Sequence, residues 1–129
     1  MNHRRGVLIV VAAMLMAGSA SAHHNMSAVF DFSDRVTLTG TLTKIDWRNP
    51  HIELIVDAKL DGNQQTWSIE GPPPSFFRVR DVNKSDVETA LGKTVTAEAS
   101  RARDGSRSGL LRVMTLPNGK VVTACPQNC

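Results

Sequence analysis

Apolar and polar residues alternate clearly along the chain from Arg35 onward. Even-numbered positions from 36 to 42 are apolar or glycine, and the odd-numbered positions between them are threonine. Successive side chains of a strand point to opposite faces, so this period of two predicts a half-buried strand. The phase then slips, because Ile45 and Trp47 fall on odd positions. We expect a bulge or sharp bend between Gly40 and Lys44 that returns both sets to one face.

Two more strands are predicted directly after this one. Asn49-Pro50 forms a turn, and Ile52–Val56 then alternates apolar and polar residues as a second strand. Asp61-Gly62-Asn63 is typical of a hairpin loop, and Thr66–Glu70 forms the third strand. The first three strands are therefore expected to form a meander.

A short helical segment should separate these strands from the rest. Gly71 and Pro72-Pro73-Pro74 end the third strand. Ser75 can cap one helical turn, and Ser85–Glu88 matches the capping box of a second. Strands are predicted again at positions 95–99, 110–116 and 120–124, the last after the turn Pro117-Asn118-Gly119.

This order of elements favours one fold class: all-β with a short helical segment. A small OB-like barrel of five to six strands has the same plan, with its helix between the third and fourth strands. An up-and-down barrel or a β-sandwich is the alternative architecture.

The N-terminal residues have the features of a secretory signal peptide. Arg4 and Arg5 precede an unbroken apolar stretch at positions 7–17, and Ala20-Ser21-Ala22 matches an A-x-A cleavage site. The stretch is too short for a permanent membrane span. We therefore expect cleavage after Ala22, or alternatively after Ala20, and a periplasmic protein without a stable membrane anchor.

The expected organisation is a cleaved signal at 1–22, an extended arm at 23–34, the barrel domain at 35–124 and a cysteine-containing tail at 125–129. Removing Arg4 and Arg5 lowers the formal net charge from +3 by two charges. The mature chain is then close to neutral, which argues against a general polyanion-binding role.

Several strings along the chain resemble one known family. These are His23-His24 followed by Phe30-Asp31, the strand VTLTGTLTKIDWRNPH, the segment WSIEGPPP, the loop DGSRSG and the closing LPNGK. Together they resemble domain-of-unknown-function family 6152, a family of small exported bacterial proteins. The resemblance implies export from a Gram-negative bacterium and a single compact domain, and it implies no activity.

All three histidines of the mature chain form a candidate metal site. After cleavage, His23 would offer its α-amine and its imidazole, and His24 and His51 could add further nitrogens. Nitrogen-rich coordination of this kind suits Cu(II). Cleavage after Ala20 would leave a third-position histidine, which also chelates Cu(II). The alternative is that the histidines are solvated, or that His51 only pairs with a carboxylate.

Both cysteines, Cys125 and Cys129, lie in the last five residues. In an exported chain they are expected to form a small terminal disulfide, with a soft-metal site as the alternative.

A second candidate site is the loop RARDGSRSG, residues Arg101–Gly109, which we call the arginine loop. Arg101, Arg103 and Arg107 belong to it, and Arg112 follows in the next strand. Arginine suits bidentate recognition of carboxylate or phosphate, so the loop predicts a site for an anionic glycan, a lipid headgroup or an envelope protein. An ordinary solvated loop is the alternative.

Enzyme motifs are not recognised in the sequence. It contains no G-x-S-x-G, no H-E-x-x-H and no phosphate-binding glycine loop. Asp46 and Glu70 could act as acids in a cleft, but the sequence identifies no partner group for either. The few aromatic residues are expected in the core and give no stacking platform for nucleic acid. We therefore predict a binding or accessory domain without catalysis.

Overall fold

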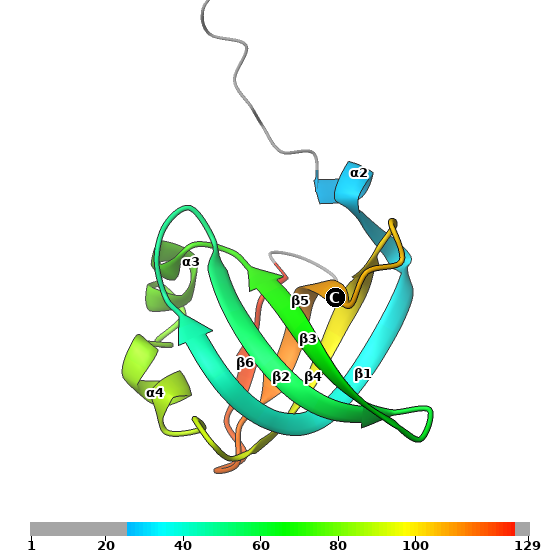
Figure 1. Cartoon of the computed structure of the whole chain (residues 1–129). Coiled ribbons are helices and arrows are strands. Elements are labelled where there is room, and N and C mark those ends of the chain that lie inside the picture. The colour runs from blue at the N-terminus through cyan, green and yellow to red at the C-terminus, as the bar shows by residue number, and fades with distance from the viewer. Residues whose placement is uncertain (1–25, 126–129) are drawn as a thin grey trace, which may run out of the picture.

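The computed structural model describes residues 26–125 (Figure 1). Its elements, in chain order, are α2 (Met26–Val29), β1 (Phe30–Asp46), β2 (Ile52–Leu60), β3 (Asn63–Gly71), α3 (Pro74–Arg78), α4 (Lys84–Glu88), β4 (Thr94–Ala102), β5 (Ser108–Thr115) and β6 (Val121–Thr123). Within these residues, no helix has the length and apolar character needed to cross a membrane.

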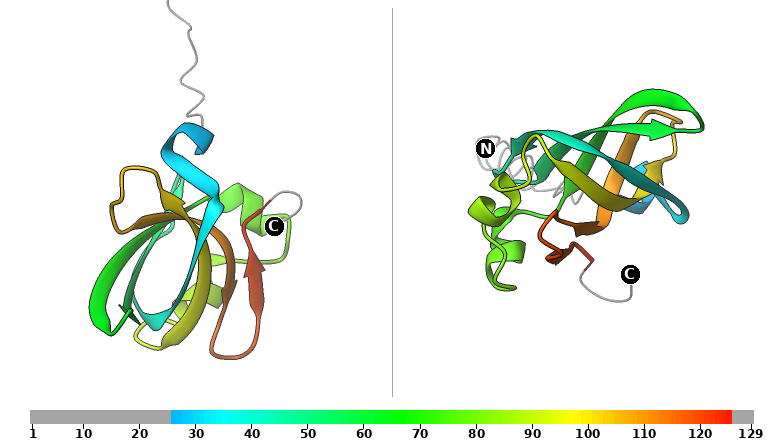
Figure 2. Two further views of the ribbon diagram at one scale, coloured as in Figure 1. Left: turned by 90° about the vertical axis from the view of Figure 1, so that its right-hand side faces the viewer. Right: turned by 90° about the horizontal axis from the view of Figure 1, so that it is seen from below.

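The six strands form one sheet in the order β3-β2-β1-β4-β5-β6. Neighbouring strands in that order are antiparallel, and a short parallel pairing of β3 with β5 joins β1 to β5 into a ring. Figures 1 and 2 show the strands curving around a common centre, with β6 beside β5 at the edge. This ring, with helices between β3 and β4, is the OB plan, so the predicted fold class is confirmed.

The core follows the predicted alternation. Val36, Leu38 and Leu42 of β1 are all buried. The register of β1 against β2 shifts between Leu42 and Lys44, which confirms the bulge expected from the change of phase. Ile45, beyond the bulge, is partly buried and packs against the same core.

Gly40 lies where β1 leaves β4 and joins β2. It is paired with Val95 on one side and with Ala58 on the other. A Cβ atom at this position would collide with the carbonyl oxygen of Asp57 and the Cα of Ala58. The close approach of β2 therefore requires glycine here.

The two short helices each place one side chain in the core, Phe77 from α3 and Val87 from α4. Their predicted caps were wrong. Pro73 is the N-cap of α3, so Ser75 lies inside the helix. Pro74 is the first helical residue, a position that proline favours because its fixed φ suits the first turn. Asn83 is the N-cap of α4, and its N–H donates to the Asp86 carboxylate at 2.7 Å.

The N-terminal segment differs from the expected extended arm. Residues Met26–Val29 form a helical turn, and β1 begins at Phe30 instead of Arg35. Phe30 is buried and pairs with Ala102 of β4, which explains why the strand starts early. Residues 23–25 of the predicted arm lie outside the described residues.

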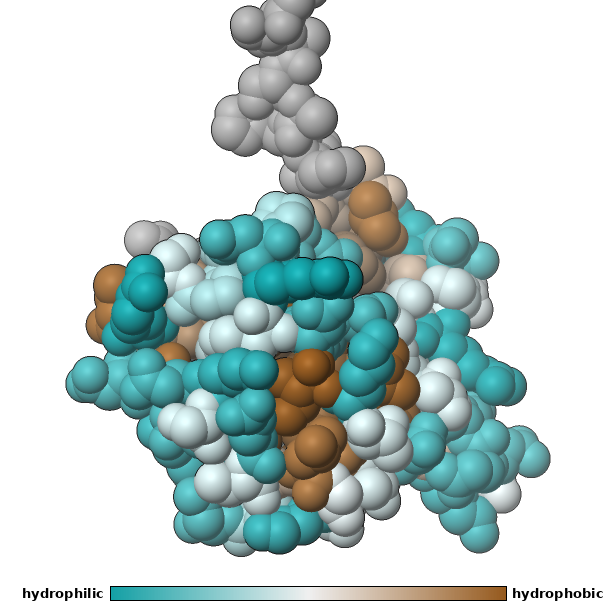
Figure 3. Space-filling model, turned by 60° about the vertical axis from the view of Figure 1, so that its left-hand side comes forward, coloured by the Kyte–Doolittle hydropathy of each residue, from teal (hydrophilic) through white to brown (hydrophobic). Residues whose placement is uncertain are grey.

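The face in Figure 3 is mostly polar, with apolar side chains gathered near its centre and smaller apolar groups toward the left edge and the top. In the described chain, the large apolar residues that are most exposed are Val29, Phe32, Val79, Leu91 and Val121. Folded domains normally expose some apolar side chains, so we assign no function to these residues.

Candidate functional site

The arginine loop connects β4 to β5 and forms one wall of a cavity of about 420 Å³. The start of β1 supplies two aspartates to this cavity, and β3 supplies a glutamine and a tryptophan. Its charged and polar lining residues are Asp31, Asp34, Gln65, Trp67, Arg101, Arg103, Ser106 and Arg107. We call it the arginine cavity.

Local hydrogen bonds fix the shape of the loop. The Asp104 carboxylate accepts a hydrogen bond from the Ser106 N–H at 2.9 Å, which is typical of an Asx turn. Hydrogen bonds from Ser106 also hold the pKa of Asp104 below its ordinary value. Gly105 takes a positive φ of 78°, and the Ser68 N–H donates to the Arg107 carbonyl at 3.0 Å. The loop is therefore tied to β3.

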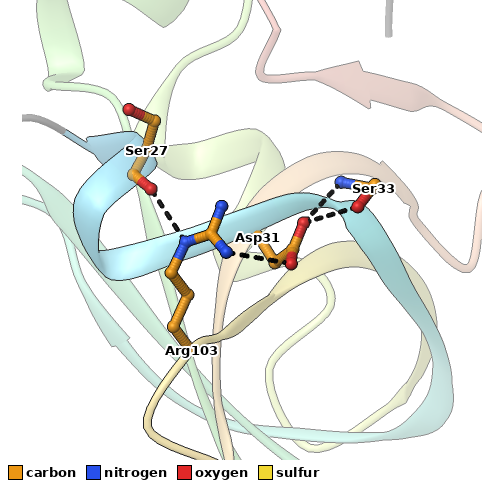
Figure 4. Close-up of polar contacts among 4 residues, drawn as sticks. All are labelled: Ser27, Asp31, Ser33 and Arg103. Carbon is orange, nitrogen blue, oxygen red and sulfur yellow. Dashed lines mark hydrogen bonds and ion pairs between the residues drawn. The ribbon is translucent and has the colours of Figure 1, made fainter.

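Arg103 connects the loop to the N-terminal segment (Figure 4). Its Nε donates to the Ser27 carbonyl at 2.9 Å, and its Nη1 donates to Asp31 Oδ2 at 3.0 Å. Asp31 Oδ1 also accepts from the Ser33 hydroxyl at 2.6 Å and from the Ser33 N–H at 3.0 Å. These Ser33 bonds, aided by Arg103, lower the pKa of Asp31. Both Arg103 and Asp31 are thus already paired within the chain.

Arg101 extends over the indole ring of Trp67, with its guanidinium carbon 5.4 Å from the ring centroid. Its Nε lies 3.4 Å from Asp34 Oδ1. The indole Nε1–H of Trp67 donates to Gln65 Oε1 at 3.0 Å, and the Trp67 residue is only 2% exposed. Trp67 therefore supports the wall of the cavity and offers no open ring face.

Arg107 differs from the other two arginines of the cavity. It is exposed, and no carboxylate within residues 26–125 forms an ion pair with it. The cavity is lined by three arginines and two aspartates. Its excess positive charge is therefore carried by the exposed side chain of Arg107.

Arg112 does not join this cavity. It is 7% exposed, its Nη1 donates to Ser100 Oγ at 3.1 Å, and its Nε lies 3.5 Å from Glu98 Oε1. Leu111, the preceding residue, is in the core, so Arg112 points to the other face of β5. The structure thus brings together three of the four arginines that the sequence singled out.

A second cavity, of about 330 Å³, lies at the loop between β1 and β2. His51 lines it, and the Nδ1 of His51 lies 2.7 Å from Glu70 Oε1. Glu53 accepts a hydrogen bond from the Ser68 hydroxyl at 2.7 Å in the same cavity. We call this the histidine cavity.

A carboxylate partner for His51 was an open alternative at the level of sequence, and the structure identifies this partner as Glu70. The sequence alone identifies no partner for Glu70. The register of β2 against β3 places Glu70 opposite Glu53. Since His51 precedes Glu53 by two residues on the same face, Glu70 lies diagonally across from His51. The cross-strand register was the signal that could have revealed the pair.

Most of the other predicted metal ligands lie outside the described part. His23 and His24 precede residue 26, and Cys129 follows residue 125. Cys125 is disulfide-bonded. Within residues 26–125, no three or more histidine, cysteine, aspartate or glutamate side chains are placed to hold a metal ion.

The two cavities lie on opposite faces of β3. Gln65 and Trp67 line the arginine cavity, whereas Ser68 and Glu70 line the histidine cavity. Alternating residues of a strand face opposite sides, which explains this division. The two loops involved, between β1 and β2 and between β4 and β5, are those that OB folds use for binding.

Comparisons with known proteins identify the family of this chain and one solved structure that is similar to it. No curated protein matches the chain. Among solved structures, the mitochondrial single-stranded DNA binding protein of S. cerevisiae is similar, with a TM-score of 0.40 and 11% identity, over 71% of this chain and 97% of that chain. Residues 10–112 match the family of unknown function DUF6152. The chain therefore belongs to the DUF6152 family.

Proposed function

We propose that this chain is an exported binding module that recognises an anionic group in the arginine cavity. The observation that carries the proposal is Arg107, an exposed arginine in a cavity that already holds two others. No acidic side chain of the described residues forms an ion pair with it. The function we assign is binding, without catalysis.

The surroundings of Arg107 favour binding of a small charged group. A volume of about 420 Å³ lies in the range of small-molecule sites. Arg101 is held over Trp67, and Arg103 is held by Ser27 and Asp31, so two walls are ordered before any ligand arrives. A carboxylate or phosphate matches the planar guanidinium of Arg107. Such a group could belong to an anionic glycan, a lipid headgroup or an envelope protein.

Export is part of the same proposal. It rests on the paired arginines, the apolar stretch and the A-x-A string of residues 1–22. Intact-mass measurement of the protein from the periplasm should give a chain that begins at His23, or at Ser21 for cleavage after Ala20. Recovery of the uncut chain would contradict export by this route.

Thermal stability in the presence of inorganic phosphate tests the binding site. A ligand that binds only the folded state raises the melting temperature, and phosphate also stabilises proteins non-specifically. Arg107→Ala removes only the specific part. Arg78→Ala, an exposed arginine on α3 that does not line the cavity, is the matched control.

We expect the wild type and Arg78→Ala to be stabilised by phosphate more than Arg107→Ala. Equal stabilisation of all three proteins would show that the effect is non-specific, and it would contradict an anion site at Arg107.

A transition-metal site is a second candidate, favoured by the contact between His51 and Glu70. Histidines that ligate metals commonly bind a carboxylate through their other ring nitrogen, and Nδ1 of His51 lies 2.7 Å from Glu70. The Nε2 atom is then the available ligand, to be joined by nitrogens of His23 and His24. Cu(II) suits such a nitrogen set.

A titration with Cu(II) tests this candidate. The correctly processed protein should show a visible d–d band and gain thermal stability, and His51→Ala should bind more weakly. Equally tight binding by His51→Ala, or by a form with an added N-terminal methionine, would contradict it.

A further inference from the structure

The two aspartates of the arginine cavity have different environments. Asp31 accepts hydrogen bonds from Ser33 and Arg103 at 2.6–3.0 Å. Asp34 has one long ionic contact, 3.4 Å to Arg101, and its side chain is 58% exposed. Asp34 is therefore the acidic group of this cavity with room for another partner.

The cavity thus presents an open cation, Arg107, and an open anion, Asp34, on its walls. A ligand with only negative charge would gain from Arg107 but would make no favourable contact with Asp34, the more exposed of the two carboxylates. A ligand that also carries a positive group would turn Asp34 into a favourable contact. Charge complementarity of this kind determines which ligands a site accepts.

We infer that the arginine cavity binds a zwitterion, whose phosphate or carboxylate group contacts Arg107 and whose primary ammonium group contacts Asp34. This inference rests on the proposed function, since it concerns the same cavity. Beyond the anionic group of the proposed function, it specifies a positive group on the ligand and Asp34 as the residue that recognises this group.

The ammonium group is primary because the cavity recognises it through oxygen acceptors. A quaternary ammonium is usually held against open aromatic faces. Among the described residues, Trp67 is the one aromatic side chain that lines this cavity, and it is 2% exposed and lies beneath Arg101. A carboxylate such as Asp34 instead favours a group with N–H donors.

Calorimetric titration with three small phosphates tests the inference: O-phosphoethanolamine, phosphocholine and ethyl phosphate. O-phosphoethanolamine should bind roughly ten-fold or more tightly than the other two, as expected for one added charged hydrogen bond. Equal affinity for O-phosphoethanolamine and ethyl phosphate would overturn the inference and leave the anion site intact. Absence of binding by all three would overturn the anion site itself.

Asp34→Asn provides the sharpest variant, because it removes the charge of an exposed side chain. We expect it to weaken O-phosphoethanolamine binding about ten-fold and to leave ethyl phosphate binding unchanged or stronger. Asp61→Asn, in the exposed hairpin between β2 and β3, is the control with the same charge change. Unchanged or tighter binding of O-phosphoethanolamine by Asp34→Asn would contradict a contact between the ammonium group and Asp34.

Vesicles distinguish a lipid headgroup from a soluble ligand of the same chemistry. Co-sedimentation with phosphatidylethanolamine vesicles, but not with phosphatidylcholine vesicles, would support the inference and identify a lipid source. Binding of soluble O-phosphoethanolamine alone would support it with a soluble source. Equal retention on phosphatidylethanolamine and phosphatidylglycerol vesicles would overturn it.

Discussion

Replacing Arg112 by alanine should change the stability of this protein, whereas replacing Arg107 should change its phosphate binding. The sequence grouped both residues in one candidate site, whereas the structure buries Arg112 against Ser100 and Glu98 and leaves Arg107 exposed in the arginine cavity. We expect Arg112→Ala to lower stability without a specific effect on phosphate binding. Arg107→Ala should weaken phosphate binding and leave stability nearly unchanged.

The cost of Arg112→Ala can be worked out from its surroundings. The substitution removes two buried methylene groups, at about 0.8 kcal/mol each. It also leaves the buried Ser100 hydroxyl without its arginine donor, at a cost of about 1 kcal/mol. Glu98 keeps its ion pair with Arg35 at 3.1 Å. The free energy of unfolding should therefore fall by about 2.5 kcal/mol.

For a domain of this size the melting temperature should drop by about 10 °C. An exposed substitution such as Arg107→Ala should stay within about 0.5 kcal/mol of the wild type. Urea unfolding followed by tryptophan fluorescence measures both changes, and a phosphate titration of each folded variant measures binding. A stable Arg112→Ala variant that has lost phosphate binding would refute the structural assignment of these two arginines.

Two further predictions concern the stability of the fold. Hydrogen bonds from Ser33, with Arg103, lower the pKa of Asp31, so its contribution to stability is complete above about pH 4 and is lost as the pH falls through its folded-state pKa. Asp31→Asn should accordingly show a smaller loss of melting temperature between pH 6 and pH 3 than the wild type, and an equal loss would contradict this role of Asp31. Gly40→Ala should destabilise the fold by about 3 kcal/mol, since its Cβ would collide with backbone atoms of β2. A Cβ atom at Gly105 would meet no atom within 4 Å, but the residue has a positive φ. Gly105→Ala should therefore lower the free energy of unfolding by only about 1 kcal/mol in chemical denaturation. A larger loss than that of Gly40→Ala would contradict the packing argument.

The sequence predicted the fold well because the alternation of apolar residues is a local signal. The β1 pattern, including the slip of phase before Ile45, was enough to predict both the strand and its bulge. The early start of β1 was not predictable in this way. Phe30 is held by pairing with Ala102, a contact between segments that are far apart in sequence.

The candidate sites were predicted only as sets of residue types. Spacing alone placed Arg112 beside Arg107, but the direction of each side chain depends on the phase of β5 after the loop. The contact between His51 and Glu70 depends on the register of β2 and β3, which the sequence does not state directly. The capping of α4 by Asn83 was missed because Ser85–Glu88 matched the same pattern two residues later.

The central claim is that an anionic group binds in the arginine cavity, and the two tryptophans allow a direct test. The indole N–H of Trp67 lies at the cavity and donates to Gln65. Trp47 packs on Phe77, with ring centroids 5.0 Å apart, and does not line this cavity.

The most direct measurement is a phosphate titration of ¹⁵N-labelled protein, followed through the two indole signals, which Trp47→Phe assigns. We predict that the Trp67 signal and the amides of residues 101–109 shift with saturation, that the Trp47 signal stays in place, and that Arg107→Ala abolishes the shifts. Saturable shifts that persist in Arg107→Ala, or an unmoved Trp67 signal at saturating phosphate, would contradict the account.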